Sequence, residues 1–83
     1  MNAKYFLSYD LASQRDMVSA IVCCQRGEAL FILGVGCARN AAWAKRKAIA
    51  HATSTVLDAA TDPMFWQRFD VAAILNMKKG HNP

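Results

Sequence analysis

Five residues near the middle of the chain have the types and the spacing to bind an anionic partner. Four are cations and the fifth is a tryptophan: Arg39, Trp43, Lys45, Arg46 and Lys47. Lysine and arginine neutralise phosphate charge, and an exposed indole ring can stack on a base or anchor a protein interface. No acidic residue lies between Glu28 and Asp58, so the four cations lack ion-pair partners nearby in the sequence. Because a solvated helix face usually mixes charges of both signs, this clustering favours an anionic partner.

Two plainer interpretations of the same residues stay open. The cations are also what the solvated face of a helix carries when nothing binds to it. Trp43 could be covered by the C-terminal segment, which contains Phe65 and Trp66 and must pack somewhere. The prediction of a contact surface therefore depends on whether that segment leaves Trp43 exposed.

The other reactive side chains predict no catalytic site. The six acids are scattered, with no pair spaced for acid–base work: Asp10, Asp16, Glu28, Asp58, Asp62 and Asp70. His51 is interpreted as a structural or surface residue, and His81 lies in the C-terminal tail. The Gly-Val-Gly at residues 34–36 is too short for a phosphate-binding loop and has no lysine–serine pair after it. We therefore expect a protein that is not an enzyme.

The three cysteines, Cys23, Cys24 and Cys37, do not form a zinc-binding pattern. Neighbouring residues of a strand point to opposite faces, so Cys23 and Cys24 are not expected to share a metal ion. A nucleophilic Cys37 is disfavoured because the sequence places no histidine beside it. An odd number of cysteines without CxxC spacing predicts reduced, partly buried thiols in a cytosolic protein, with no metal and no cofactor.

Apolar residues at a spacing of two predict the strands that must position these side chains. The alternation is clear over residues 5–11, and apolar runs at 17–24 and 29–36 follow it. Polar residues separate the first two runs, and Gln-Arg-Gly-Glu at 25–28 separates the last two. These three runs predict an antiparallel meander.

The turn between the second and third runs fixes an expected register. Gly27 can supply the positive φ that a tight turn requires. With Arg26 and Gly27 at the tip, Ile21 would lie opposite Ile32. Cys23 would then lie opposite Leu30, and both faces of the hairpin would be apolar. Each face should therefore be covered by another element.

A long helix is predicted next, from an N-cap at Asn40 to about Ala60. Gly34 and Gly36 mark the end of the preceding strand, where the backbone bends or approaches another element closely. Small and apolar residues share one face of the helix: Ala41, Ala48, Ile49, Ala52, Val56 and Ala59. Arg39, Trp43, Arg46 and Lys47 lie roughly opposite. Lys45 falls near the apolar stripe, from which it would have to extend towards solvent.

The C-terminal segment is predicted to form a second helix. Asp62 and Pro63 suit its N-cap and first position, and the Lys-Lys-Gly at 78–80 suits its end. Its apolar stripe would consist of Phe65, Phe69, Ala72 and Ala73. A fourth strand at residues 69–75 is the alternative.

Together these elements predict one α+β domain over residues 1–83. It would consist of a three-stranded antiparallel sheet, a long helix and a C-terminal helical segment. That segment would cover the second face of the sheet or the helix. Otherwise a partner in a homodimer must cover the second face.

The order of elements resembles the C-terminal half of a double-stranded-RNA-binding domain. That family has a glycine-x-glycine-x-serine-lysine-lysine-x-alanine-lysine motif. Gly34 and Gly36 match its glycines, Arg39 its first lysine and Ala42 its alanine. Ala38, Asn40 and Trp43 depart from the serine, the second lysine and the last lysine, and the Ala-Lys-Arg-Lys-Ala at 44–48 restores the pattern two residues late.

The resemblance implies contacts between Arg39, Lys45, Arg46 and Lys47 and the phosphates of a nucleic acid, read by shape rather than by sequence. It covers about half of the chain, because the first helix of that family, which reads the minor groove, has no counterpart here. In size and layout the chain is also similar to anti-CRISPR proteins, small phage inhibitors that occlude a nuclease or guide-RNA complex. That similarity implies protein–protein binding to a host defence complex.

Charge and hydropathy set the remaining expectations. The net charge is +4 and the pI is about 9.3, which favours acidic partners such as nucleic acid. The first ten residues lack the layout of a signal peptide, and the longest apolar run is about half of what spans a bilayer. We expect a cytoplasmic binding module that contacts nucleic acid or a nucleoprotein complex through its basic helix. The alternative is an inhibitor that binds a host protein through a surface that includes Trp43 or Trp66.

Overall fold

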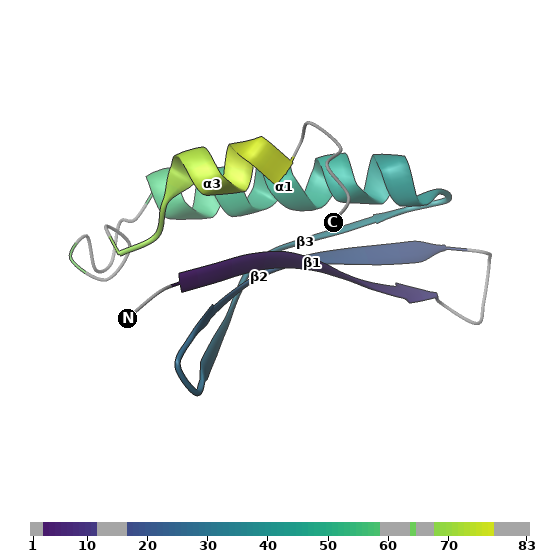
Figure 1. Cartoon of the computed structure of the whole chain (residues 1–83). Helices are drawn as coiled ribbons and strands as arrows, with labels where there is room; N and C mark the ends of the chain where they lie inside the picture. The colour runs from purple at the N-terminus through teal and green to yellow at the C-terminus, as the bar shows by residue number, and fades with distance from the viewer. Residues whose placement is uncertain (1–2, 12–16, 59–63, 65–67, 78–83) are drawn as a thin grey trace.

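The computed structural model of the protein describes residues 3–11, 17–58, 64 and 68–77. The elements in chain order are β1 (Ala3–Leu11), β2 (Val18–Arg26), β3 (Ala29–Ala38), α1 (Ala41–Leu57) and α3 (Val71–Asn76). The strands form an antiparallel sheet in the order β1-β2-β3, with α1 and α3 above it (Figure 1). This confirms the expected α+β layout, and the helix at 71–76 shows that a strand over residues 69–75 was the wrong alternative.

The hairpin of β2 and β3 turns at Gly27 and Glu28, because Arg26 pairs with Ala29. Gly27 has a φ of 59°, the left-handed conformation that a two-residue hairpin loop requires at its first position. The expected register was wrong. Cys23 lies opposite Ile32 rather than Leu30. The error arises because the loop starts one residue later than the predicted tip. Moving the loop by one residue moves the partner of each β2 residue by two positions along β3.

A β-bulge at Leu33 changes which residues of β3 face the helices. Val22 pairs with Gly34 while its neighbour Cys23 pairs with Ile32, so Leu33 has no partner of its own. Leu33 and Gly34 are consecutive and both are buried, in contrast to the alternation elsewhere in the strand. The bulge therefore turns both Gly34 and Gly36 towards α1.

These two glycines let α1 lie directly on β3. A Cβ atom at Gly34 would collide with the backbone of Ala52 and Ala48, and one at Gly36 with the backbone of Ala48 and Ala44. Alanines at every fourth position of α1 thus meet glycines at every second position of β3. The small residues of this segment serve close helix–strand packing, as the sequence predicted.

The observed helix confirms its expected start but ends earlier. The Asn40 side chain accepts a hydrogen bond from the Trp43 backbone amide at 2.9 Å, as an N-cap does. Asp58 is the C-cap, two residues before the expected end. The buried residues are Ala44, Ala48, Ile49, Ala52 and Val56. Ala41 was wrongly placed on this face, since it is exposed and Ala44 is buried, whereas Ala59 lies outside the described residues.

The C-terminal helix has a different start and a different buried face from those expected. The Asp70 side chain accepts from the Ala73 amide at 3.2 Å and caps α3, so the expected helix running unbroken through residue 70 was wrong. Phe65, the first residue of the expected stripe, lies outside the described residues. Ala72 is consequently exposed, and Phe69 and Ile74 enter the core. The expected N-cap at Asp62 and Pro63 and the expected stop at 78–80 lie outside the described residues.

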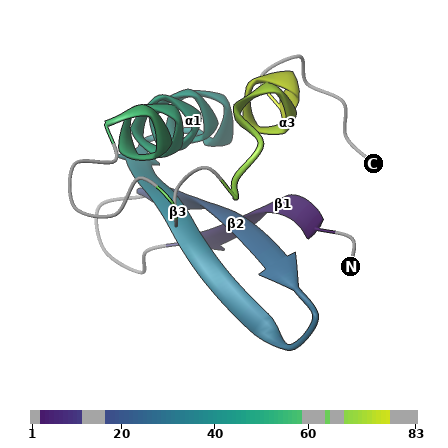
Figure 2. The same cartoon turned by 90° about the vertical axis from the view of Figure 1, so that its left-hand side faces the viewer.

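Both helices lie on the same face of the sheet (Figure 2). Their buried residues form one core with Ala20, Val22 and Cys24 of β2. The Tyr5 hydroxyl of β1 accepts a hydrogen bond from the Asp70 amide at 2.6 Å, which ties α3 to the sheet. The C-terminal helix therefore lies beside α1, and no described element covers the second face of the sheet.

Candidate functional site

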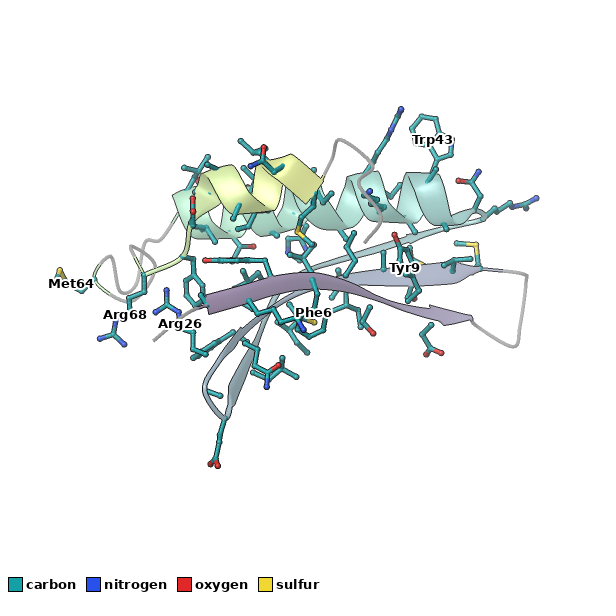
Figure 3. All side chains as sticks on the ribbon, viewed as in Figure 1. Phe6, Tyr9, Arg26, Trp43, Met64 and Arg68 are labelled. Atoms are coloured by element: carbon teal, nitrogen blue, oxygen red, sulfur yellow. The ribbon has the colours of Figure 1, made fainter. Side chains whose placement is uncertain are left out.

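The first two turns of α1 carry an exposed tryptophan stacked with an arginine. Trp43 is 55% exposed and points away from the sheet (Figure 3). The Arg46 guanidinium carbon lies 5.1 Å from the centroid of the Trp43 ring, within the range of a cation–π contact. The helix positions the pair, because residues three apart lie on one side of it. Since α3 leaves Trp43 exposed, this residue is available for contact.

Arg39 and Lys47 lie to either side of this pair along the chain. Arg39 is exposed and directly precedes the N-cap. The Lys47 ammonium donates a hydrogen bond to the Cys37 carbonyl oxygen of β3 at 3.2 Å. That bond holds Lys47 beside the outer edge of the sheet, but the bonded oxygen is uncharged and leaves the charge of Lys47 uncompensated.

Lys45 does not join the other cations. It lies about 200° around the helix from Trp43 and is half-buried, consistent with its predicted place near the apolar stripe. Of the five residues, the structure thus brings Trp43 and Arg46 into contact, places Arg39 and Lys47 near them, and separates Lys45. We call Arg39, Trp43, Arg46 and Lys47 the α1 cation surface.

The electrostatic setting of the α1 cation surface is strongly positive. The first turn of α1 carries no acidic residue, so the positive end of the helix dipole adds to the side-chain charges. Within the described residues, none of the four sequence-predicted cations forms an ion pair with a carboxylate. Asp58, at the far end of α1, is hydrogen-bonded to the Ser54 hydroxyl at 3.3 Å. The surface can therefore attract an anion at no cost in existing ion pairs.

His51 has a structural place at the edge of β3. Its Nδ1 lies 3.1 Å from the Val35 amide nitrogen and 3.2 Å from the Val35 carbonyl oxygen. An edge strand presents backbone groups that need partners, and His51 and Lys47 together supply two of them. This agrees with the interpretation of His51 as a structural residue.

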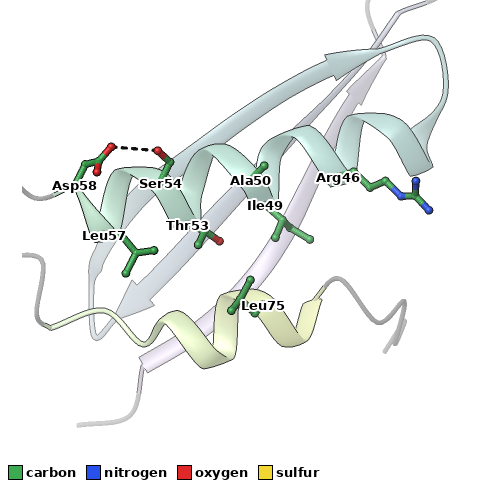
Figure 4. A pocket seen from close by; sticks show the side chains of 8 residues that line it. All are labelled: Arg46, Ile49, Ala50, Thr53, Ser54, Leu57, Asp58 and Leu75. Atoms are coloured by element: carbon green, nitrogen blue, oxygen red, sulfur yellow. Dashed lines mark hydrogen bonds between the residues drawn. The ribbon is translucent and has the colours of Figure 1, made fainter.

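A groove between α1 and α3 was not expected from the sequence. It has a volume of about 380 Å³ and begins beside Arg46 (Figure 4). Its walls are Arg46, Ile49, Ala50, Thr53, Ser54, Leu57, Asp58 and Leu75. Leu57 is 68% exposed and Leu75 is 45% exposed, so the groove presents apolar side chains beside the charged Arg46 and Asp58. The sequence places the apolar Leu57 on the side of α1 away from the sheet, which could have indicated a second apolar contact there. Only the position of α3 shows that a groove exists.

The described residues hold neither a cluster of three potential metal ligands nor a helix long and apolar enough to cross a membrane. What the arrangement offers is a positive, partly aromatic surface beside an apolar groove, which is suited to binding. Comparison of this chain with protein-family models, with curated proteins and with solved structures finds no match.

Proposed function

We propose that the protein is a non-enzymatic binding module that contacts nucleic acid, free or in a nucleoprotein complex, through the α1 cation surface. The observation that carries the proposal is the exposed stack of Arg46 on Trp43 at the positive end of α1. Arginine contacts phosphates, and an aromatic ring such as that of tryptophan can stack on a base. Arg39 and Lys47 extend the positive charge on either side of the stack.

Arg39, Arg46 and Lys47 each bind a phosphate oxygen in this proposal. Trp43 is free to stack on an unpaired base, whereas a duplex would offer it only sugar and groove edges. Neutralising about three phosphates predicts that the logarithm of the binding constant falls with the logarithm of salt concentration at a slope of about −3. Lys45, on the other side of the helix, contributes only through long-range attraction.

Fluorescence titration tests this proposal. In a Trp66→Phe background, the emission of Trp43 is followed while duplex RNA, duplex DNA and single strands are added at two salt concentrations. Arg46→Glu and Lys47→Glu should each weaken binding about tenfold or more, because each replaces a phosphate contact with a repulsive charge. Arg68→Glu changes the net charge equally at an exposed position of the segment before α3, so it serves as the matched control.

Three outcomes would count against the proposal. Absence of binding at low salt would exclude direct contact with nucleic acid. Equal weakening by Arg68→Glu and Arg46→Glu would assign the binding to overall charge rather than to α1. A salt slope near zero would show that phosphates are not the contact.

The apolar groove favours a second candidate, a protein-directed inhibitor or adaptor. Leu57 and Leu75 line the groove together with Arg46 and Asp58, so an interface there would combine apolar burial with contacts to one charge of each sign. For this candidate, Leu57→Ser and Trp43→Ala should abolish capture of the partner and salt should matter little. The nucleic-acid proposal predicts the reverse order of effects.

A further inference from the structure

The second face of the sheet is an apolar surface that no described element covers. Cross-strand pairing places Phe6, Cys23 and Ile32 in one row across the three strands, and Ser8, Ile21 and Val35 in the next. Their neighbours along each strand point to the opposite face, where α1 and α3 lie. We call these six residues together with Leu30 the open sheet face; within it Cys23 is only 4% exposed, and Phe6 and Ile21 are half-buried.

Large apolar side chains of β3 are exposed on this face. Leu30 is 58% exposed, Ile32 is 61% exposed and Val35 is 46% exposed, although all three are strand residues. An antiparallel sheet with one solvated face normally alternates apolar with polar residues, and contiguous apolar patches mark interaction sites. The open sheet face is thus a candidate interface, separate from the α1 cation surface on the other side of the molecule.

The charges at the two ends of the face indicate which partner fits. Among the described strand residues that point to this side, Lys4 and Asp10 carry the charges, and both belong to β1. They lie at opposite ends, six residues apart, with the apolar rows between them. A second copy turned by 180° about an axis across the strands would place its Asp10 over this Lys4, and its Lys4 over this Asp10. The pattern is self-complementary, as a two-fold interface requires.

We propose that the open sheet face binds a second copy of this chain, sheet to sheet, with β1 antiparallel over its counterpart. The alternative two-fold axis, parallel to the strands, would stack β1 on β3 and set Lys4 over Leu30, with no partner for either charge. The strands of two aligned, packed sheets cross at about 30°. A two-fold axis that runs across the strands is compatible with this crossing angle, because each sheet can be rotated by half of it. The α1 cation surfaces then face outward on opposite sides of the dimer, so this inference does not depend on the proposed function.

The size of the face predicts how tightly the copies bind. Three strands of about nine residues cover an area of about 14 by 30 Å, or about 400 Å². A standard interface buries about 800 Å² of each partner, so this one belongs to the small class. We therefore expect a dimer that dissociates in the micromolar range rather than an obligate one.

Sedimentation equilibrium between about 1 μM and about 1 mM tests the proposal through a charge exchange. Lys4→Glu and Asp10→Lys each place like charges opposite one another twice in the dimer, and each should raise the dissociation constant about tenfold. The double variant exchanges the two charges and should restore the wild-type value. Ile32→Ser should also weaken the dimer, whereas Arg46→Glu on α1 should leave it unchanged.

Thermal unfolding of each variant confirms that its fold is intact before the association is compared. Restoration by the double variant cannot come from a general loss of stability, so it separates the proposal from misfolding. A wild-type chain that stays monomeric to about 1 mM overturns the proposal and leaves the face to a different protein. A dimer that is indifferent to both single charge changes overturns the stacking of β1 on its counterpart.

Discussion

The three cysteines differ in exposure, and this difference is visible residue by residue. Cys37 is exposed on β3, whereas Cys23 is 4% exposed and Cys24 is fully buried under the helices. The expectation of partly buried thiols was therefore wrong for Cys37. Burial raises the pKa of the Cys23 thiol, because desolvation disfavours the thiolate. Exposure therefore separates Cys37 from the other two cysteines, and because thiolate is the reactive form, the raised pKa further lowers the reactivity of Cys23.

We predict that one thiol reacts quickly with a disulfide reagent at neutral pH and two react only when the protein unfolds. Cys37→Ser should remove the fast phase and leave the slow phase unchanged. The pKa of Cys23 is higher in the folded protein than in the unfolded chain, so protonation of this thiol favours the folded state. Its contribution to the free energy of unfolding is fully present below the unfolded pKa and is lost as the pH rises through the folded pKa. Three equal reaction rates in the folded protein would contradict the buried positions of Cys23 and Cys24.

The α1 helix lies directly on β3, in backbone contact at Gly34 and Gly36. Replacing Gly36 by alanine adds a methyl group where the α1 backbone already lies. We expect Gly36→Ala to lower the free energy of unfolding by about 1–3 kcal/mol, because the helix must move away from the strand. Urea denaturation measures this loss. Ala42→Ser, a small change at an exposed position of α1, should stay within about 0.5 kcal/mol. Equal stability of Gly36→Ala and wild type would show that α1 does not lie this close.

The sequence predicted the elements whose apolar residues recur at a regular spacing. It did not predict the features that depend on the conformation of a single residue. The alternation in 5–11 predicted β1 because a spacing of two between apolar residues is a property of the whole run. The insertion of Leu33 into β3 and the loop at Gly27 and Glu28 each depend on local geometry, and a strand pattern reads equally well one residue either way. The start of α3 was missed because Asp70 lies within a run that is otherwise continuous in helical pattern.

The candidate site was predictable to the same extent. The proximity of Trp43 to Arg46 follows from helical spacing, and the unpaired charge follows from the absence of acids between residues 28 and 58, but the exposure of Trp43 depends on where α3 lies. The groove exists, and both helices cover the same face of the sheet, because of where α3 docks. That docking involves contacts between residues far apart in the sequence, such as Tyr5 with Asp70 and Phe31 with Phe69, which no local pattern encodes.

The whole molecule has two unlike sides. One carries the α1 cation surface and the apolar groove, and the other carries the open sheet face (Figures 1 and 3). A chain of this size has one core, and here α1 fills only part of it. Phe69 meets Phe31 edge to face at a centroid distance of 5.4 Å, and Ile74 is fully buried beside them in the same core. Residues 68–77 are therefore a structural part of the domain.

From this follows a prediction about cooperativity. Ile74→Ala should lower the free energy of unfolding by about 2–5 kcal/mol, because the cavity lies within a core shared by the sheet and both helices. Domains of this size are stabilised by about 5–15 kcal/mol, so the melting temperature should fall markedly. Leu75→Ala removes a similar side chain at a position that is 45% exposed, and it should lower the free energy of unfolding much less.

If far-ultraviolet circular dichroism and Trp43 fluorescence shift together in Ile74→Ala, α3 unfolds with the sheet. If only a minor early transition appears while the main midpoint stays, α3 is a separate unit, and the groove beside Arg46 would open without loss of the α1 cation surface.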